Sequence, residues 1–224
     1  MTTQQGFLAA VSAALGRTAP LEAPGARSGR SLEPGGTAAG PGREILARAF
    51  ADCSREIGAA VVETTRAGLP GALRSAVASA GPGPVVVAND PLLGGLGPAE
   101  ALLAGREVRV WGGGSPREEL VGFAARAAAG LAVATMALAE SATVLLLGGG
   151  SSVSLLPESV LFVVPSSRIR PRLTEGMEFL SRLGALPAAV HFVSGPSATS
   201  DIELIRVVGV HGPVHVTHIV VGDM

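Results

Sequence analysis

Apolar positions along the chain follow two spacings, one typical of helices and one typical of strands. Some segments repeat an apolar side chain every three or four residues, whereas others are short apolar runs bounded by glycine and proline. Helices are predicted over residues 45–57, 69–80, 99–104, 116–129 and 171–183. Strands are predicted over residues 59–63, 85–88, 107–111, 131–135, 143–147, 159–164, 189–193 and 215–221.

The order of these segments predicts the fold class. Short apolar strands separated by helices are typical of an α/β protein with a mostly parallel sheet covered on both faces. Ligands of such sheets bind in the loops at the carboxyl ends of strands. The loops that follow the later strands are therefore the expected place for a site.

The first 42 residues differ from the remainder of the chain. Residues 7–15 have the pattern of a short amphipathic helix, and residues 16–42 are dense in Gly, Pro and Ala. The second stretch offers little periodic apolar surface, as expected of a linker or a loosely wrapped arm. We therefore predict an N-terminal arm over residues 1–42 and one α/β domain over residues 43–224.

Composition narrows the functions that this chain can have. The 224 residues are 47% apolar and carry a formal net charge of −1. Binding to nucleic acid or to an anionic membrane surface needs a cationic excess, so neither partner is expected. The longest apolar run, residues 127–139, is shorter than the roughly 20 residues of a membrane span. No signal peptide is expected, because no positive charge precedes the first apolar turn.

The chain has one cysteine, Cys53. A single thiol cannot form an internal disulfide or supply the ligands of an iron–sulfur cluster. This usage favours a reducing compartment, so the expected location is the cytoplasm. Cys53 itself is expected to be a small core residue.

Polar residues between two predicted strands form the first candidate site. Glu140, Ser141 and Thr143 place a carboxylate beside two hydroxyls, which can act as a nucleophile, a general base or an acceptor for a ligand hydroxyl. The alternative is a solvated turn, because Ser and Thr are common in turns.

The strongest candidate is the loop at residues 194–203, which follows the predicted strand at 189–193. Its hydroxyls and backbone N–H groups can bind a polar or phosphorylated ligand, and its carboxylates can orient a base or a metal-bound water. The alternative is a helix cap, and the two are compatible. The residues singled out are Ser194, Gly195, Ser197, Thr199, Asp201 and Glu203.

His211 lies in a turn forced by Gly212 and Pro213, where it can serve as an acid or base near neutral pH. All four histidines fall within the last 34 residues, which raises the question of a metal site. His215 and His218 point to opposite faces of a strand, because three residues separate them. We therefore predict no metal site, and expect both rings to have their nitrogens satisfied.

Two weaker candidates complete the set. Residues 148–152, Gly-Gly-Gly-Ser-Ser, can cradle a phosphate or form a plain flexible turn. Arg168, Arg170 and Arg172 can hold an anion or form a solvated loop.

Residues 139–143, 194–203 and 209–213, in this order, resemble the lactate-utilisation protein C family, whose LUD domain was formerly a domain of unknown function. The resemblance covers residues 43–222. It implies a Rossmann-like three-layer α/β/α sandwich similar to the sugar-isomerase and coenzyme A transferase superfamily. It also implies a role in oxidising L-lactate to pyruvate, beside two partner proteins that carry iron–sulfur clusters.

The chain departs from the family pattern in two segments. Members often have Thr-Gly-Thr where this chain has Ser141, Ala142 and Thr143, and a basic residue where it has Ala198. If that basic residue neutralises an anionic ligand, an arginine from residues 168–172 would have to replace it here.

The expected function is a non-iron–sulfur component of an L-lactate utilisation system, which binds a small anionic ligand or its partner subunits through the C-terminal loops. The alternative is a stand-alone transferase-like enzyme or a binder of a phosphorylated or carboxylated metabolite. Whether the chain is an enzyme is left open, and no cofactor is expected on it. Candidate catalytic residues are Glu140, Asp201, Glu203 and His211. Candidate ligand-binding residues are Ser141, Thr143, Ser194, Gly195, Ser197, Thr199 and Gly212.

Overall fold

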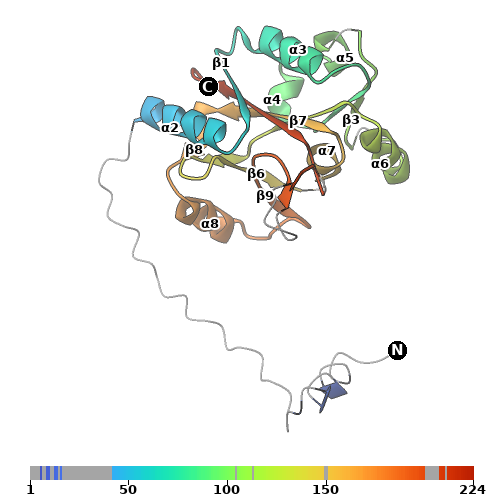
Figure 1. The fold of residues 1–224 in the computed structure, drawn as a ribbon, viewed down its shortest axis with the longest axis vertical. Coiled ribbons are helices and arrows are strands. Elements are labelled where there is room, and N and C mark those ends of the chain that lie inside the picture. The colour runs from blue at the N-terminus through green and yellow to red at the C-terminus, as the bar shows by residue number, and fades with distance from the viewer. Residues whose placement is uncertain are drawn as a thin grey trace. The chain divides into compact units, whose positions relative to one another are not determined.

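The structure is a computed structural model that describes residues 42–103, 105–112, 114–148, 151–199, 207–209 and 211–224, with Gly6, Ala9, Ala10, Ala13, Ala14 and Gly16 (Figure 1). The chain divides into two compact units, residues 1–40 and 41–224. Within the predicted helix at residues 7–15, the four described alanines are helical. The other residues of that helix, and most of the predicted arm, lie outside the described residues.

A six-stranded parallel sheet forms the centre of the larger unit. The strand order places the last strand of the chain beside the first, because β12 pairs with both β1 and β7. In spatial order the strands are β1 (Ala60–Thr64), β12 (His215–Val221), β7 (Ser159–Pro165), β4 (Ala129–Val133), β2 (Val85–Val87) and β3 (Val108–Val110).

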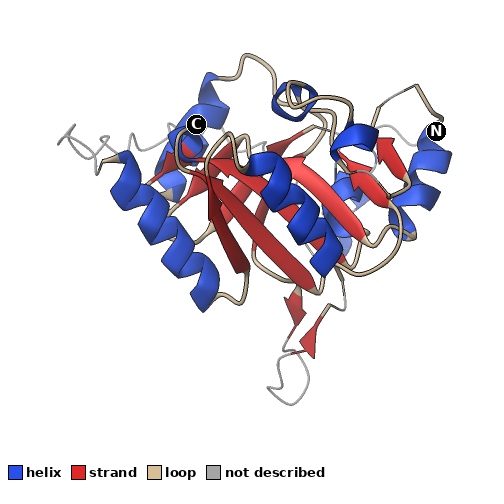
Figure 2. Ribbon diagram, turned by 90° about the horizontal axis from the view of Figure 1, so that it is seen from above, coloured by secondary structure: helices blue, strands red, loops and turns tan. Residues whose placement is uncertain are grey.

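Helices cover both faces of this sheet, as Figure 2 shows. One face packs against α2 (Arg43–Glu56), α6 (Arg117–Ala125) and α7 (Ser151–Leu155). The other face packs against α3 (Leu69–Ser79), α4 (Pro91–Gly94) and α5 (Ala99–Leu102). Alternate residues of each strand pack into the two cores on opposite faces of the sheet. The predicted three-layer α/β sandwich is thus confirmed.

A second sheet lies beside the first and has the order β8-β5-β6-β9. One face of this sheet joins the main core through Val144 and Leu146. The other face packs against α8 (Leu173–Arg182) through Leu138 and Leu145. Its strands are β5 (Met136–Leu138), β6 (Thr143–Leu147), β8 (Ile169–Arg170) and β9 (Val190–Ser194), and β6 runs antiparallel to both β5 and β9. The remaining elements are η1 (Ser166–Arg168), β10 (Ala198–Thr199) and β11 (Val207–Val208).

The stretch around residues 116–139 differs from the expectation. The helix predicted to reach residue 129 ends at Ala125, because Ala128 N–H donates to Pro84 O and Ala129 already pairs with Val85 in the sheet. The strand predicted at 131–135 is β4, shifted by two residues. The strand β5 was not predicted at all. Among the described helices, none has the length and apolar character to cross a membrane.

One glycine allows α7 to lie directly on the sheet. A Cβ atom at Gly130 of β4 would collide with the backbone carbonyl of Val153 and would lie 3.2 Å from Pro157 Cγ. The last two residues of the predicted Gly-Gly-Gly-Ser-Ser turn, Ser151 and Ser152, are the first residues of α7, so the prediction of a turn or phosphate loop over 148–152 is wrong for them.

Candidate functional site

Three hydroxyl groups are linked by hydrogen bonds where β6 begins and β9 ends. Thr143 and Ser194 stand opposite each other in the second sheet. Thr143 Oγ1 lies 2.6 Å from Ser194 Oγ and 2.7 Å from Ser141 Oγ. Thr143 is buried, Ser141 is half-buried and Ser194 is exposed. We call Ser141, Thr143 and Ser194 the hydroxyl cluster.

The backbone on each side of the hydroxyl cluster takes the left-handed conformation. Ala142 has a φ of 48° and its methyl group is fully buried. Glycine adopts this conformation most easily, so the expected glycine at this position has a physical reason in the backbone. Gly195 has a φ of 68°, and a Cβ atom there would lie 2.9 Å from Ile57 Cδ1. The fold therefore requires glycine at position 195, independently of the predicted role of Gly195 in ligand binding.

The carboxylate of Glu140 is held at the start of α8. Glu140 Oε1 accepts a 2.7 Å hydrogen bond from the backbone N–H of Leu173, the first residue of that helix. A carboxylate at this place also interacts favourably with the helix dipole. Glu140 therefore has a capping role, and its side chain remains exposed to solvent.

The end of α2 contacts both segments of this region. Cys53 Sγ lies 3.6 Å from the carbonyl oxygen of Glu140, and Ile57 packs against Gly195. Cys53 and Ile57 are one helical turn apart, so α2 holds the turn at residues 139–142 beside the bend at Gly195. Burial, with a smaller contribution from Glu56, raises the pKa of the Cys53 thiol, which favours the protonated, unreactive form.

The histidine turn adjoins the same region through Ser197. Ser197 N–H donates to Pro213 O at 3.0 Å, and a Cβ atom at Gly212 would lie 3.2 Å from Ser197 Cβ. His211 is exposed and Thr199 is half-buried in β10. Asp201 and Glu203 lie outside the described residues.

A cavity of about 520 Å³ borders the histidine turn. Gly212 lines it together with Gly209, Arg126 and Glu158, and no member of the hydroxyl cluster does. The structure thus arranges the described candidates in two neighbouring groups, the hydroxyl cluster and the histidine turn, joined by residues 194–197.

The weaker candidates have mainly structural contacts. Arg168 Nη1 donates to the carbonyl oxygen of Ala134 at 2.8 Å, and Arg170 Nη1 donates to the carbonyl of Ser167. Arg168 therefore fixes the backbone where β4 ends, and Arg170 fixes the backbone of η1. Gly148 has a φ of 89°, while Gly149 and Gly150 lie outside the described residues.

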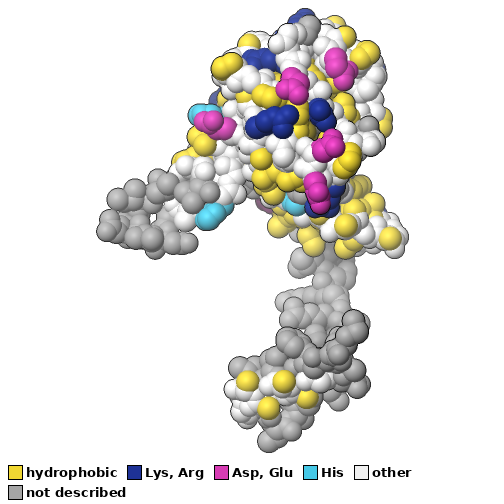
Figure 3. Space-filling view, turned by 90° about the vertical axis from the view of Figure 1, so that its right-hand side faces the viewer, with side chains coloured by type: hydrophobic (Ala, Val, Ile, Leu, Met, Phe, Trp, Pro, Cys, Tyr) yellow, Lys and Arg dark blue, Asp and Glu magenta, His cyan; other side chains and the backbone are white. Residues whose placement is uncertain are grey.

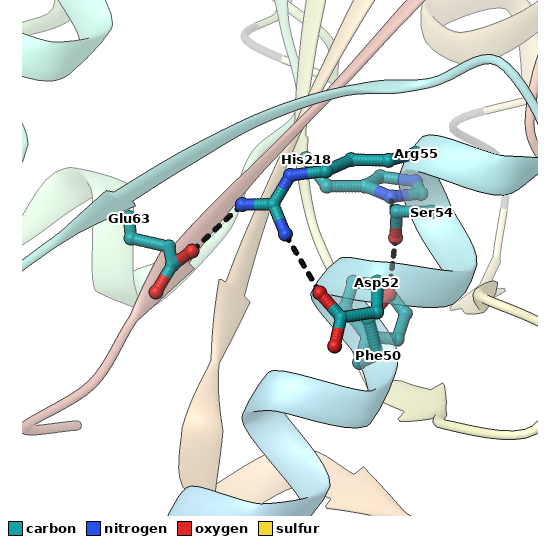
Figure 4. A network of polar contacts seen from close by, with 6 residues as sticks. All are labelled: Phe50, Asp52, Ser54, Arg55, Glu63 and His218. Atoms are coloured by element: carbon teal, nitrogen blue, oxygen red, sulfur yellow. Dashed lines mark hydrogen bonds and ion pairs between the residues drawn. The ribbon is translucent and has the colours of Figure 1, made fainter.

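His218 is a fully buried histidine next to α2 (Figure 4). Ser54 Oγ donates to Phe50 O at 2.6 Å, so it accepts from the Nδ1–H of His218 at 2.8 Å. Nε2 has no hydrogen-bond partner, so the expectation of satisfied ring nitrogens is wrong for His218. Desolvation lowers the pKa of His218 to about 4, and the ring is therefore neutral at pH 7. The pair Ser54 and His218 had no local sequence signal, because 164 positions separate them.

His215 shares a strand face with Ile219, which packs in the core with α3. His218 instead lies against Phe50 of α2, so the two strand histidines do point to opposite faces as predicted. Within the part of the chain that the structure describes, no group of three His, Cys, Asp or Glu residues is placed to hold a metal ion.

Charged side chains of both signs mix on the face that carries α6, as Figure 3 shows. Arg109 lies 3.7 Å from Glu119, and Arg126 lies 3.7 Å from Glu107. Both guanidinium groups also lie over the ring of Phe123, at 5.4 and 4.8 Å from its centroid. The arginines on this face are thus paired locally and form no continuous basic surface in this view.

A parallel sheet between two helical layers defines the class of the protein, a Rossmann-like α/β protein. Residues 48–221 match the family model of the LUD domain, and the chain belongs to the LUD-domain family. The resemblance inferred from the sequence is thereby confirmed.

Relatives and a solved structure agree with this assignment. The Lactate utilization protein C of Anoxybacillus flavithermus is 38% identical over 183 residues, which are 80% of this chain and 81% of that protein. The Lactate utilization protein C of Bacillus subtilis is 36% identical over 175 residues, which are 73% and 72% of the two chains. The crystal structure of a DUF162 family protein from Deinococcus radiodurans is similar with a TM-score of 0.60 and 27% identity, over 80% of this chain and 98% of that one.

Proposed function

We propose that this chain is the non-iron–sulfur component of a system that oxidises L-lactate to pyruvate, and that it binds a small anionic ligand at the hydroxyl cluster. Relatives named Lactate utilization protein C, which match this chain over most of their length, support the biological role. The observation that carries the ligand site is the hydrogen-bonded set of three hydroxyls between β6 and β9.

The hydroxyl cluster has a donor to offer to a ligand. Three hydroxyl groups carry three protons, and the two hydrogen bonds between them use two. Thr143 Oγ1 also donates to the carbonyl oxygen of Ser141 at 3.5 Å, so the third proton is free for a ligand when this longer bond shares the Thr143 proton that Ser194 accepts. If the bonds run from Ser141 through Thr143 to Ser194, this proton is on the exposed Ser194, where the carboxylate of an incoming ligand can accept it.

Electron transfer in the proposed system needs partner proteins. The single cysteine cannot supply the set of thiolates that holds an iron–sulfur cluster. We therefore assign the clusters to partner subunits and no cofactor to this chain. The work of this chain is then to bind the ligand and to contact the subunits that accept electrons.

Gene deletion tests the biological role. A strain that lacks this chain is expected to lose growth on L-lactate as sole carbon source while it still grows on pyruvate. Affinity purification of the tagged chain from lactate-grown cells is expected to recover cysteine-rich iron–sulfur proteins. Unchanged growth on L-lactate after deletion would refute the proposed role.

Calorimetric titration of the purified chain tests the ligand site, with L-lactate, pyruvate and inorganic phosphate as probes. Binding by wild type is expected to weaken in Thr143→Val, which removes both hydrogen bonds of the hydroxyl cluster at nearly constant volume. Thr217→Val changes a threonine in β12 and serves as the matched control.

A ligand at 100 times its Kd should also stabilise the fold by about 2.7 kcal/mol. Equal affinities in both variants would contradict this site. Binding of an anion together with unchanged growth on lactate would favour the alternative, a stand-alone transferase-like enzyme or a binder of a phosphorylated or carboxylated metabolite.

A further inference from the structure

A cavity of about 420 Å³ opens at the carboxyl ends of β2 and β3, away from the hydroxyl cluster. Val87 and Val110, the last residues of these strands, line it together with Leu131 of β4. The other walls come from the turn after β2 and from α4 and α5. The volume is within the range of small-molecule sites, roughly 300–1,000 Å³.

The path of the chain explains why a cavity forms here. After β2 the chain passes through α4 and α5 to β3, on one side of β2. After β4, which pairs with β2 on its other side, the chain continues to β7 in the opposite direction. The connections that leave β2 and β4 therefore diverge. Open α/β sheets bind ligands in the crevice at such a point, where the strand order reverses.

The floor of the cavity is apolar. Val87, Leu93, Leu102, Leu103 and Leu131 line it, and each of these side chains is at most 7% exposed. These side chains belong to the core between the sheet and α3, α4 and α5, whereas the second sheet packs on the opposite core. The cavity and the hydroxyl cluster share no residue.

The polar groups of the cavity select against anions. Asn89, Asp90 and Glu100 line its rim, and none of the described residues that line it is basic. Ionised carboxylates only accept hydrogen bonds, so they favour a ligand that donates. A phosphate or carboxylate would meet like charge with no cation to offset it. Asp90 Oδ1 accepts from Leu92 N–H at 2.8 Å, which holds this carboxylate in place at the start of α4.

We propose that this cavity binds a nucleoside, with the flat base on the leucine floor and the ribose hydroxyls donating to Asp90 and Glu100. An uncharged ring system matches the apolar floor, and two neighbouring hydroxyl donors match a rim that carries two carboxylates. The site goes beyond the proposed lactate role, since it uses neither the hydroxyl cluster nor the histidine turn.

Titration of the full chain with adenosine, guanosine, cytidine and uridine tests the proposal, followed by calorimetry or by backbone amide shifts. At least one nucleoside is expected to bind and to shift the amides of residues 87–90 and 99–103. Two analogues of that nucleoside test the roles of the ribose hydroxyls and of ligand charge. The 2′,3′-dideoxy form is expected to bind at least tenfold more weakly because it has lost its donors. The 5′-monophosphate is expected to bind more weakly than the parent nucleoside because of its charge.

The double variant Asp90→Asn and Glu100→Gln is expected to lose affinity about tenfold or more, while asparagine at residue 90 still caps α4. Glu100→Gln alone changes an exposed side chain and supplies a second, milder test. Glu118→Gln on α6 is the matched control and should bind as wild type does.

No binding by any of the four nucleosides at millimolar concentration would overturn the proposal, as would equal binding of the dideoxy form. Thr143→Val is expected to leave nucleoside binding unchanged, so failure at this cavity and failure of the proposed lactate role are separate outcomes.

Discussion

The buried histidine of β12 makes the stability of this protein depend on pH. His218 is fully buried between Phe50 and Phe162, with ring centroids 5.0 and 5.9 Å away, and its Nε2 has no hydrogen-bond partner. A proton on Nε2 would place a charge in this apolar site without a counter-ion. The folded protein therefore resists protonation, whereas an unfolded chain accepts the proton freely.

The size of the effect follows from the two pKa values. Burial lowers the pKa of His218 from 6.5 to about 4. Above pH 6.5 the residue is mostly neutral in both states, so its burial makes the free energy of unfolding depend little on pH. Between pH 6.5 and about 4 only the unfolded state gains the proton, so the free energy of unfolding falls as the pH falls. At about 1.4 kcal/mol per pKa unit the full loss is about 3 kcal/mol, of which about 2.5 kcal/mol is reached at pH 4.5.

The test compares urea unfolding of wild type and His218→Phe at pH 7 and pH 4.5. Phenylalanine fills a similar volume and does not titrate, and Ser54 can still donate to Phe50 O. Wild type is expected to lose about 2.5 kcal/mol more than the variant between the two pH values. His215→Asn removes an exposed histidine of the same strand and serves as the control. Equal losses in wild type and His218→Phe would refute the reasoning.

Substitutions at three positions test the contacts around the candidate site, each by chemical denaturation. Gly130→Ala is expected to cost about 1–3 kcal/mol, because its methyl group would collide with the backbone of α7, and a neutral result would show that α7 can move away. Glu140→Ala should cost about 1 kcal/mol and Glu140→Gln much less if the residue mainly caps α8; lactate growth that fails in both would instead assign the carboxylate a functional role. Arg168→Ala should cost about 1–3 kcal/mol, since the carbonyl of Ala134 loses its charged donor, and unchanged stability would mean that water replaces it.

The strands that the sequence predicted best are those with clear local boundaries. The predicted ranges 143–147 and 215–221 are the observed β6 and β12. Both are rich in β-branched and aliphatic residues and begin directly after a turn. The strand β5 was missed because Ala134 and Thr135, where the chain turns out of β4, interrupt the apolar run too weakly to mark a boundary. The antiparallel second sheet depends on pairing between distant segments, which local propensity does not encode.

The candidate site was predicted in its residues but not in its contacts. Ser141, Thr143 and Ser194 were named from the sequence, yet the hydrogen bond that joins the last two spans 51 positions. The capping contact of Glu140 with α8 is similarly remote in sequence. The turn at Asn89 and Asp90 was not among the predicted sites, because the hydroxyl-rich loops follow the later strands. The cavity beside it follows from the strand order, which becomes visible only in the assembled sheet.

The most direct test of the central claim is growth on L-lactate of a deletion strain that carries either Thr143→Val or Thr217→Val at equal expression. The proposed function requires that the strain with Thr217→Val grows like wild type and that the strain with Thr143→Val does not, with both growing equally on pyruvate. Normal growth of the Thr143→Val strain on L-lactate would contradict a role for the hydroxyl cluster in lactate oxidation.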